Sequence, residues 1–195
     1  MGNKKQQVKI SSNIELNPFY IDSEITLFDK NYKFLINNFL NVFINANPDL
    51  LGNLDGSIEI NLKNLKNSII NNGKINLIIN EKTLKLKNAL FEIDKVGIIK
   101  SKFKYYENEG EMIFSSNNCL EINNKKEFSK KFQISQSKLK KINKIFFDFE
   151  SNIDNEEISI SNIHINKIDK EKQEDEFYII KNIQEFRNLL KQILI

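Results

Sequence analysis

The chain has 195 residues and a net charge of +3, with 40% hydrophobic and 28% charged residues. This length suits one domain of ordinary size, and the regular placement of the apolar residues argues against wholesale disorder. The lysines are scattered among acidic residues, and Arg187 is the only arginine. Because proteins that bind nucleic acids usually concentrate positive charge and favour arginine, we expect no nucleic-acid partner.

A single cysteine, Cys119, excludes an intramolecular disulfide and a metal site built from a cysteine cluster. No stretch reaches the roughly 18 consecutive apolar residues of a membrane-spanning helix, so we expect no transmembrane segment in this chain. The glycines are too dispersed for a nucleotide-binding loop, in which closely spaced glycines let backbone amides approach phosphate. We therefore expect neither a metal nor a cofactor.

Apolar and polar residues alternate along most of the chain, and this period of two is typical of strands with one apolar face. Gly56, Gly73, Gly97 and Gly110 each lie where a strand begins or a turn is needed, and Asn72-Gly73 is a strong turn signal. Because short breaks join consecutive strands, we expect an antiparallel sheet. The predicted strands cover residues 8–16, 57–65, 74–79, 83–94, 98–106, 111–115, 119–122, 145–150 and 157–166.

Helical spacing replaces this alternation in a few segments. Asp29 caps a predicted helix over residues 30–45, whose apolar residues are Tyr32, Leu35, Ile36, Phe39, Leu40 and Phe43. Asn124 and Glu127 resemble a capping box and predict a short helix over residues 125–132. A final amphipathic helix is expected over residues 177–194, with a narrow apolar seam suited to docking on a sheet or on another helix. The seam consists of Ile179, Ile183, Phe186, Leu190 and Ile193.

These elements predict a mainly β domain over residues 1–166, with the helices at 30–45 and 125–132 embedded in it. Residues 167–176 are strongly charged and are expected to form a solvated linker, followed by the helical segment 177–195.

No pattern of catalytic residues emerges from the sequence. His164, the only histidine, lies between Ile163 and Ile165, so strand alternation favours a solvated side chain over a catalytic base or a metal ligand. Cys119 precedes Leu120 in the same way, which favours a passive thiol over a reactive one. We expect no enzyme activity, because no polar groups converge.

Alternation instead nominates one continuous apolar face. Two interpretations of this face stay open, a core covered by the two long helices or a groove that they leave partly bare. The nominated lining residues are Ile58, Ile60, Leu62, Ile75, Leu77, Ile79, Leu84, Leu86, Phe91, Ile93, Ile99, Phe103, Tyr105, Met112, Phe114, Leu120 and Ile122.

Several stretches together resemble a known family. They are GSIEINLKNL, GKINLIINEKTLKLKNALFEID, VGIIKSKFKYYENEGEMIFSS, CLEINNKKEFSKKFQI and ISISNIHIN. In pattern they are similar to the C-terminal part of AsmA-like proteins, the envelope-biogenesis family of Gram-negative bacteria with TamB-type and YhdP-type members. The resemblance covers roughly residues 8–166.

The resemblance implies a curled antiparallel sheet, called a β-taco or repeating β-groove, whose concave apolar face takes phospholipid acyl chains. The implied function is phospholipid transport between inner and outer membranes, and thus outer-membrane biogenesis. The implied location is the periplasm, with association to the inner membrane through a segment absent from this chain. The alternative is a non-catalytic scaffold for outer-membrane protein assembly, which binds envelope proteins or the remainder of a longer chain through a sheet edge or the terminal helix.

Overall fold

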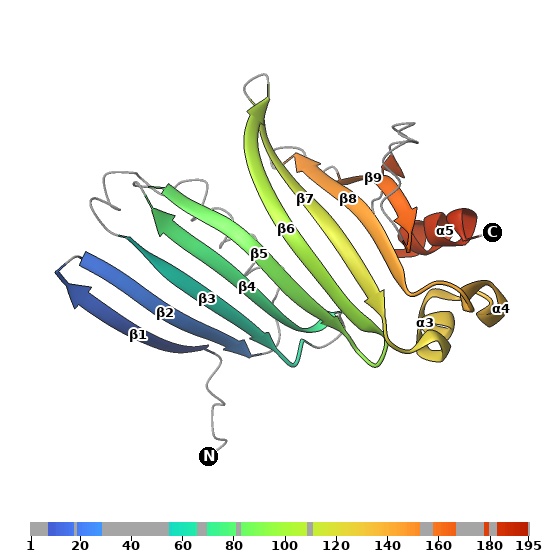
Figure 1. The fold of residues 1–195 in the computed structure, drawn as a ribbon, viewed down its shortest axis with the longest axis horizontal. Helices are drawn as coiled ribbons and strands as arrows, with labels where there is room; N and C mark the ends of the chain where they lie inside the picture. Colours follow the sequence, from blue (N-terminus) through green and yellow to red (C-terminus); the bar gives the residue numbers. More distant parts are fainter. Residues whose placement is uncertain are drawn as a thin grey trace, which may run out of the picture. The chain divides into compact units, whose positions relative to one another are not determined.

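The computed structural model describes residues 8–17, 19–28, 55–65, 70–80, 83–108, 111–152, 158–166, 178–179 and 183–194. The chain divides into two compact units, Met1–Phe91 and Glu92–Ile195, called here the N-terminal and C-terminal units. The expected β class is confirmed, because the described residues form a mixed, unclosed sheet with three short helices. Within each unit the strands neighbour one another in chain order (Figure 1).

Five strands build the N-terminal unit. They are β1 (Val8–Leu16), β2 (Phe19–Phe28), β3 (Asp55–Lys63), β4 (Ile70–Asn80) and β5 (Thr83–Ile93), the last of which continues into the C-terminal unit. β1 and β2 form an antiparallel hairpin, and β3 and β4 are also antiparallel.

The expectation of a wholly antiparallel sheet is wrong at one strand pair. β2 is a strand that we did not predict, and it pairs with β3 in parallel, with Tyr20 opposite Asp55 and Phe28 opposite Lys63. A parallel pair needs a crossover of a dozen or more residues, and residues 29–54 separate these two strands in the chain. The helix predicted over residues 30–45 falls in this segment and lies outside the described residues.

Strand register gathers the apolar side chains of the N-terminal unit on one face. Ile60 is opposite Ile25 on β2 and Ile75 on β4, and all three point to the same side because alternation continues across paired strands. Ile60 and Leu77 are only 2% and 1% exposed, and together with Leu62 they form the buried cluster of this face. Burial of each such side chain contributes about 1.5–3 kcal/mol.

In the C-terminal unit, each strand from β6 to β10 is antiparallel to the next. The strands are β6 (Gly97–Asn108), β7 (Glu111–Ile122), β8 (Lys144–Asn152), β9 (Ile158–Ile165) and β10 (Tyr178–Ile179). β7 is one continuous strand, which corrects the prediction of two strands at 111–115 and 119–122. An irregularity in register between Phe146 and Asp148 breaks the pairing of β8 with β9.

The connection from β7 to β8 holds α3 (Lys125–Phe132) and α4 (Gln136–Leu139) (Figure 1). α3 has the bounds expected from the sequence. It begins where the Asn124 side chain accepts a hydrogen bond from the backbone N–H of Glu127 at 3.1 Å, and it ends at Gln133, whose φ of 58° is left-handed. Phe128 and Phe132 lie on its buried side, with ring centroids 4.6 Å apart.

The terminal helix is shorter than we predicted. α5 spans Ile183–Ile193, whereas Tyr178 and Ile179 form β10 and pair with Ile160 and Ser159 of β9. The physical reason is that an edge strand offers unpaired backbone groups, which an extended segment can satisfy as well as a helical turn can.

Candidate functional site

On the apolar face of the N-terminal unit, the side chains at the centre are buried and those around them are half-buried. Among the lining residues predicted from the sequence, Leu84 has a side chain that lies outside the described set. Four of the nominated residues are buried, namely Ile60, Leu62, Leu77 and Ile79. Four more are half-buried and pack against the cluster of Ile60, Leu62 and Leu77. They are Ile58, Ile75, Leu86 and Phe91.

The nominated residues of the C-terminal unit divide in the same way. Ile93, Leu120 and Ile122 are buried, whereas Ile99, Phe103 and Phe114 are half-buried. The side chains of Tyr105 and Met112 lie outside the described set.

Three aromatic rings form a half-buried patch on the apolar face of the C-terminal unit. The Phe103 and Phe114 rings are stacked with centroids 5.1 Å apart, and Phe149 meets Phe114 edge-on at 6.4 Å. Phe149 was not nominated, although the alternation of Ile145, Phe147 and Phe149 on β8 carries the same signal as the other strands. We call Phe103, Phe114 and Phe149 the phenylalanine patch.

A buried polar cluster interrupts this face next to the phenylalanine patch. Ser101, Ser116 and Asn118 are 4%, 3% and 8% exposed. Ser101 donates its hydroxyl to Asn118 Oδ1 at 2.7 Å, and Asn118 Nδ2 donates to the backbone carbonyl oxygens of Ser116 at 3.0 Å and Phe147 at 3.2 Å. The alternation that places Phe114 and Leu120 inward places Ser116 and Asn118 inward as well, so the sequence carries a signal for this cluster that we did not use.

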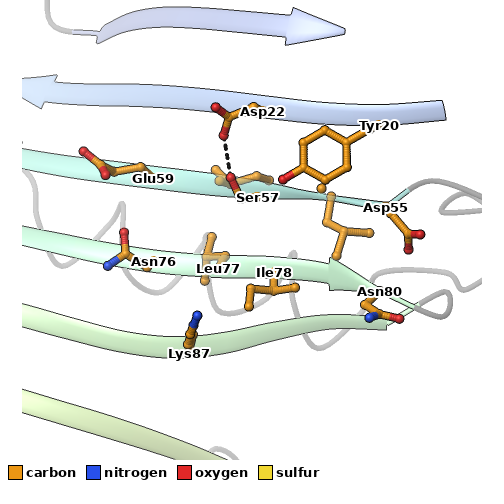
Figure 2. Close-up of a pocket in the computed structure, with 13 residues that line it drawn as sticks. Tyr20, Asp22, Asp55, Ser57, Glu59, Asn76, Leu77, Ile78, Asn80 and Lys87 are labelled. Carbon is orange, nitrogen blue, oxygen red and sulfur yellow. Dashed lines mark hydrogen bonds between the residues drawn. The ribbon is translucent and has the colours of Figure 1, made fainter. Parts of the chain in front are cut away.

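The opposite face of the N-terminal unit is polar and contains a hollow of about 560 Å³. Its lining comes from β2, β3, β4 and β5, and Figure 2 shows Tyr20, Asp22 and Ser57 on one side and Lys87 on the other. Ser57 donates a hydrogen bond to Asp22. The lining includes acidic and amide side chains together with Lys87.

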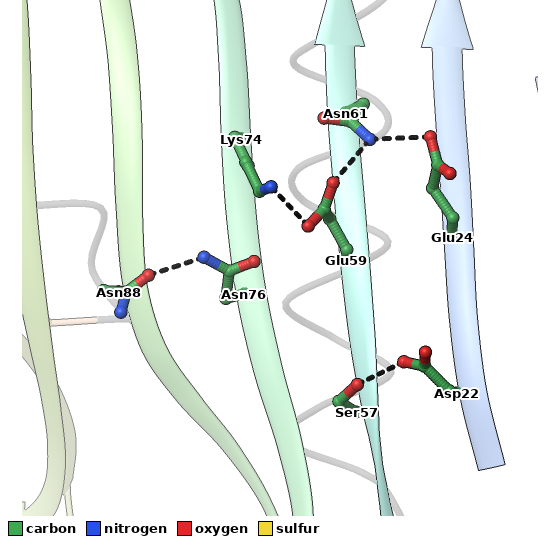
Figure 3. A network of polar contacts seen from close by, with 8 residues as sticks. All are labelled: Asp22, Glu24, Ser57, Glu59, Asn61, Lys74, Asn76 and Asn88. Atoms are coloured by element: carbon green, nitrogen blue, oxygen red, sulfur yellow. Dashed lines mark hydrogen bonds and ion pairs between the residues drawn. The ribbon is translucent and has the colours of Figure 1, made fainter.

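A hydrogen-bonded network ties the strands together beside this hollow (Figure 3). Asn61 Nδ2 donates to Glu24 on β2 and to Glu59 on its own strand, both at 3.0 Å. Lys74 on β4 lies 2.5 Å from Glu59, and its hydrogen bond lowers the pKa of that carboxyl. The network is a cross-strand ladder that stabilises pairing.

The polar face of the C-terminal unit carries a second charged group. Lys100 and Lys144 each lie 2.8 Å from a different oxygen of Glu121, and their hydrogen bonds lower the pKa of this carboxyl to about 2. Cys119 lies half-buried on β7, and burial raises the pKa of its thiol, which disfavours the reactive thiolate. His164 is half-buried and pairs with Phe146 across the sheet.

The seam of the terminal helix lies against its own unit. Leu190 is 2% exposed, and Ile193 packs with Ile160 and Leu189. The ring of Phe186 lies 6.1 Å from that of Phe147 on β8 and 6.2 Å from that of Phe132 on α3. The side chains of the other two seam residues, Ile179 and Ile183, lie outside the described set.

Within the described part of the chain, no cluster of three or more histidine, cysteine or acidic side chains is placed to hold a metal. None of the helices described there has the length and apolar composition required to cross a bilayer. The chain matches no protein-family model, no curated protein and no solved structure. The half-buried side chains on the apolar face of each unit can make apolar contacts with a ligand.

Proposed function

We propose that this chain is an AsmA-like lipid-binding module that takes part in phospholipid transport between inner and outer membranes in the periplasm. The observation that supports the proposal is the phenylalanine patch, because three aromatic rings in contact with one another lie half-buried together on one apolar face. An unclosed sheet can present such a face to a ligand without first opening.

The energetics of apolar contact support an acyl chain as the ligand. Each buried methylene contributes about 0.8 kcal/mol, so about ten methylenes gain roughly 8 kcal/mol before the entropic cost of binding. That gain needs no polar recognition.

The test is to purify the full chain from an envelope-bearing bacterium, extract it and quantify phospholipid per protein by mass spectrometry. Replacement of both Phe103 and Phe114 by serine should lower the bound lipid about tenfold, because it removes most of the aromatic contact area. Phe146→Ser is the matched control, since Phe146 is half-buried in the same unit but pairs with Cys119 on the opposite face. Wild-type protein free of phospholipid, or equal losses in both variants, would contradict the proposal.

A further inference from the structure

The first strand of the N-terminal unit is an exposed edge. β1 lies at the end of the strand order, and β2 is its neighbour among the described strands (Figure 1). All nine residues of β1 are exposed, although four of them are large and apolar. Exposure reaches 66% at Ile10 and 81% at Leu16. An exposed edge strand with apolar side chains is a template for pairing with another strand.

The two faces of β1 have different chemistry. Val8, Ile10, Ile14 and Leu16 continue the apolar face of the unit, as their partners Leu27, Ile25, Ile21 and Phe19 on β2 do. Lys9 and Glu15 point to the polar side, and the described residues provide neither of them with an ion-pair partner.

We propose that two copies of this chain pair through β1, antiparallel and centred on Ser12, to form a homodimer with a continuous sheet. About Ser12 the sequence VKISSNIEL is complementary to itself. Val8 is opposite Leu16 of the second copy and Ile10 is opposite Ile14, so both apolar pairs lie on one face. Lys9 is opposite Glu15, and the two-fold axis repeats this ion pair.

Other registers lack this complementarity. A shift by one residue sets Ile10 opposite Glu15 and Lys9 opposite Leu16, which mixes apolar and charged side chains on each face. A shift by two residues separates Lys9 from Glu15. A parallel pair sets Lys9 opposite its own copy, and like charges directly opposite are destabilising.

Charge reversal tests the pairing, with the molar mass of the full chain measured by sedimentation over a concentration series that reaches the high micromolar range. Wild type should dimerise, and added salt should weaken the dimer. Lys9→Glu or Glu15→Lys places two like-charged pairs across the axis and should raise the dissociation constant about tenfold or more. The double variant K9E/E15K should restore the dimer, and the two single variants mixed in equal amounts should form a heterodimer.

The side chains of Lys9 and Glu15 are exposed and have no partner among the described residues, so we expect each variant to keep the fold. Circular dichroism checks this. A wild type that stays monomeric throughout the series overturns the proposal. A dimer that both single variants leave unchanged overturns it as well, because β1 would then not be the interface.

Cross-linking tests the register directly. In a background of Cys119→Ser, Ser12→Cys sets two thiols opposite each other on the axis, where antiparallel Cα atoms lie about 4.5–5.5 Å apart, within disulfide range. This variant should oxidise to a covalent dimer. Asn13→Cys is the matched control, because its two copies are offset along the strands beyond that range and should stay largely reduced. Equal cross-linking of the two variants overturns the Ser12-centred register.

Discussion

Replacing Asn118 by leucine should destabilise the C-terminal unit, although it makes the apolar face more apolar. Asn118 accepts from Ser101 and donates to the carbonyl oxygens of Ser116 and Phe147. Leucine removes these partners and leaves buried polar groups unsatisfied, at about 1–3 kcal/mol for each. With part of this loss offset by apolar burial, we expect the free energy of unfolding to fall by about 2–4 kcal/mol.

The companion variant removes the whole cluster, with Ser101→Ala and Ser116→Ala added to Asn118→Leu. No hydroxyl is then left without its partner, although the carbonyl oxygens of Ser116 and Phe147 still lack the Asn118 amide, so the triple variant should be more stable than Asn118→Leu by about 1–2 kcal/mol. Urea denaturation followed by circular dichroism measures both effects through the midpoint and slope of the transition. Asn117→Leu is the control, because Asn117 is exposed on the opposite face and loses only a solvent-exposed hydrogen bond to Asp148, so stability should fall by no more than about 1 kcal/mol. A neutral Asn118→Leu variant, or a triple variant as unstable as the single one, would refute the reasoning.

Three further perturbations follow from the geometry. Lys100 and Lys144 hold the pKa of Glu121 at about 2, below its ordinary 4.5. The ion pairs therefore contribute stability that is present above pH 4.5 and lost as the pH falls towards 2. Glu121→Gln should remove that part of the acid sensitivity, as measured by urea midpoints at neutral and acid pH; an unchanged pH dependence would argue against it. Leu77→Ala should lower the free energy of unfolding by about 2–5 kcal/mol, since a fully buried side chain leaves a cavity, and a loss below about 1 kcal/mol would show that the site is open. Gly97→Ala should lower it by about 1–3 kcal/mol, because a Cβ there overlaps the backbone carbonyl of Glu121; a thermal midpoint equal to that of wild type would contradict this.

Much of the fold was predictable from alternation, because a strand with one buried face records that face in every second residue. β3, β4, β6 and β9 were located this way to within a few residues. β2 carries the same signal, with Ile21, Ile25 and Leu27 on one side and Asp22 and Glu24 on the other, and we overlooked it. Its parallel direction was not predictable, since alternation is identical for either direction of pairing.

Two local features were hidden for a different reason. We predicted a break between two strands at Ser116 and Asn118, because polar residues are not expected at inward positions. Only the structure shows that Ser101 and the carbonyl of Phe147 satisfy them. We predicted helix at β10 because Ile179 fits the apolar rhythm of the following segment, and the edge of β9 that pairs with β10 is distant in the sequence.

On the lipid-binding function proposed above, the buried polar cluster would determine how an acyl chain lies on the C-terminal unit. Ser101, Ser116 and Asn118 cross the apolar face between the half-buried Phe103 and Phe114 on one side and the buried Leu120 on the other. A chain that runs along the strands has to pass over all three groups, whereas one that crosses the strands from Phe103 to Phe149 passes over Ser116 alone, which pairs with both. The patch therefore favours an acyl chain lying across β6, β7 and β8. In that binding mode, the triple variant without the polar cluster should bind no less lipid than wild type, because the bound chain meets only position 116, where alanine is less polar than serine.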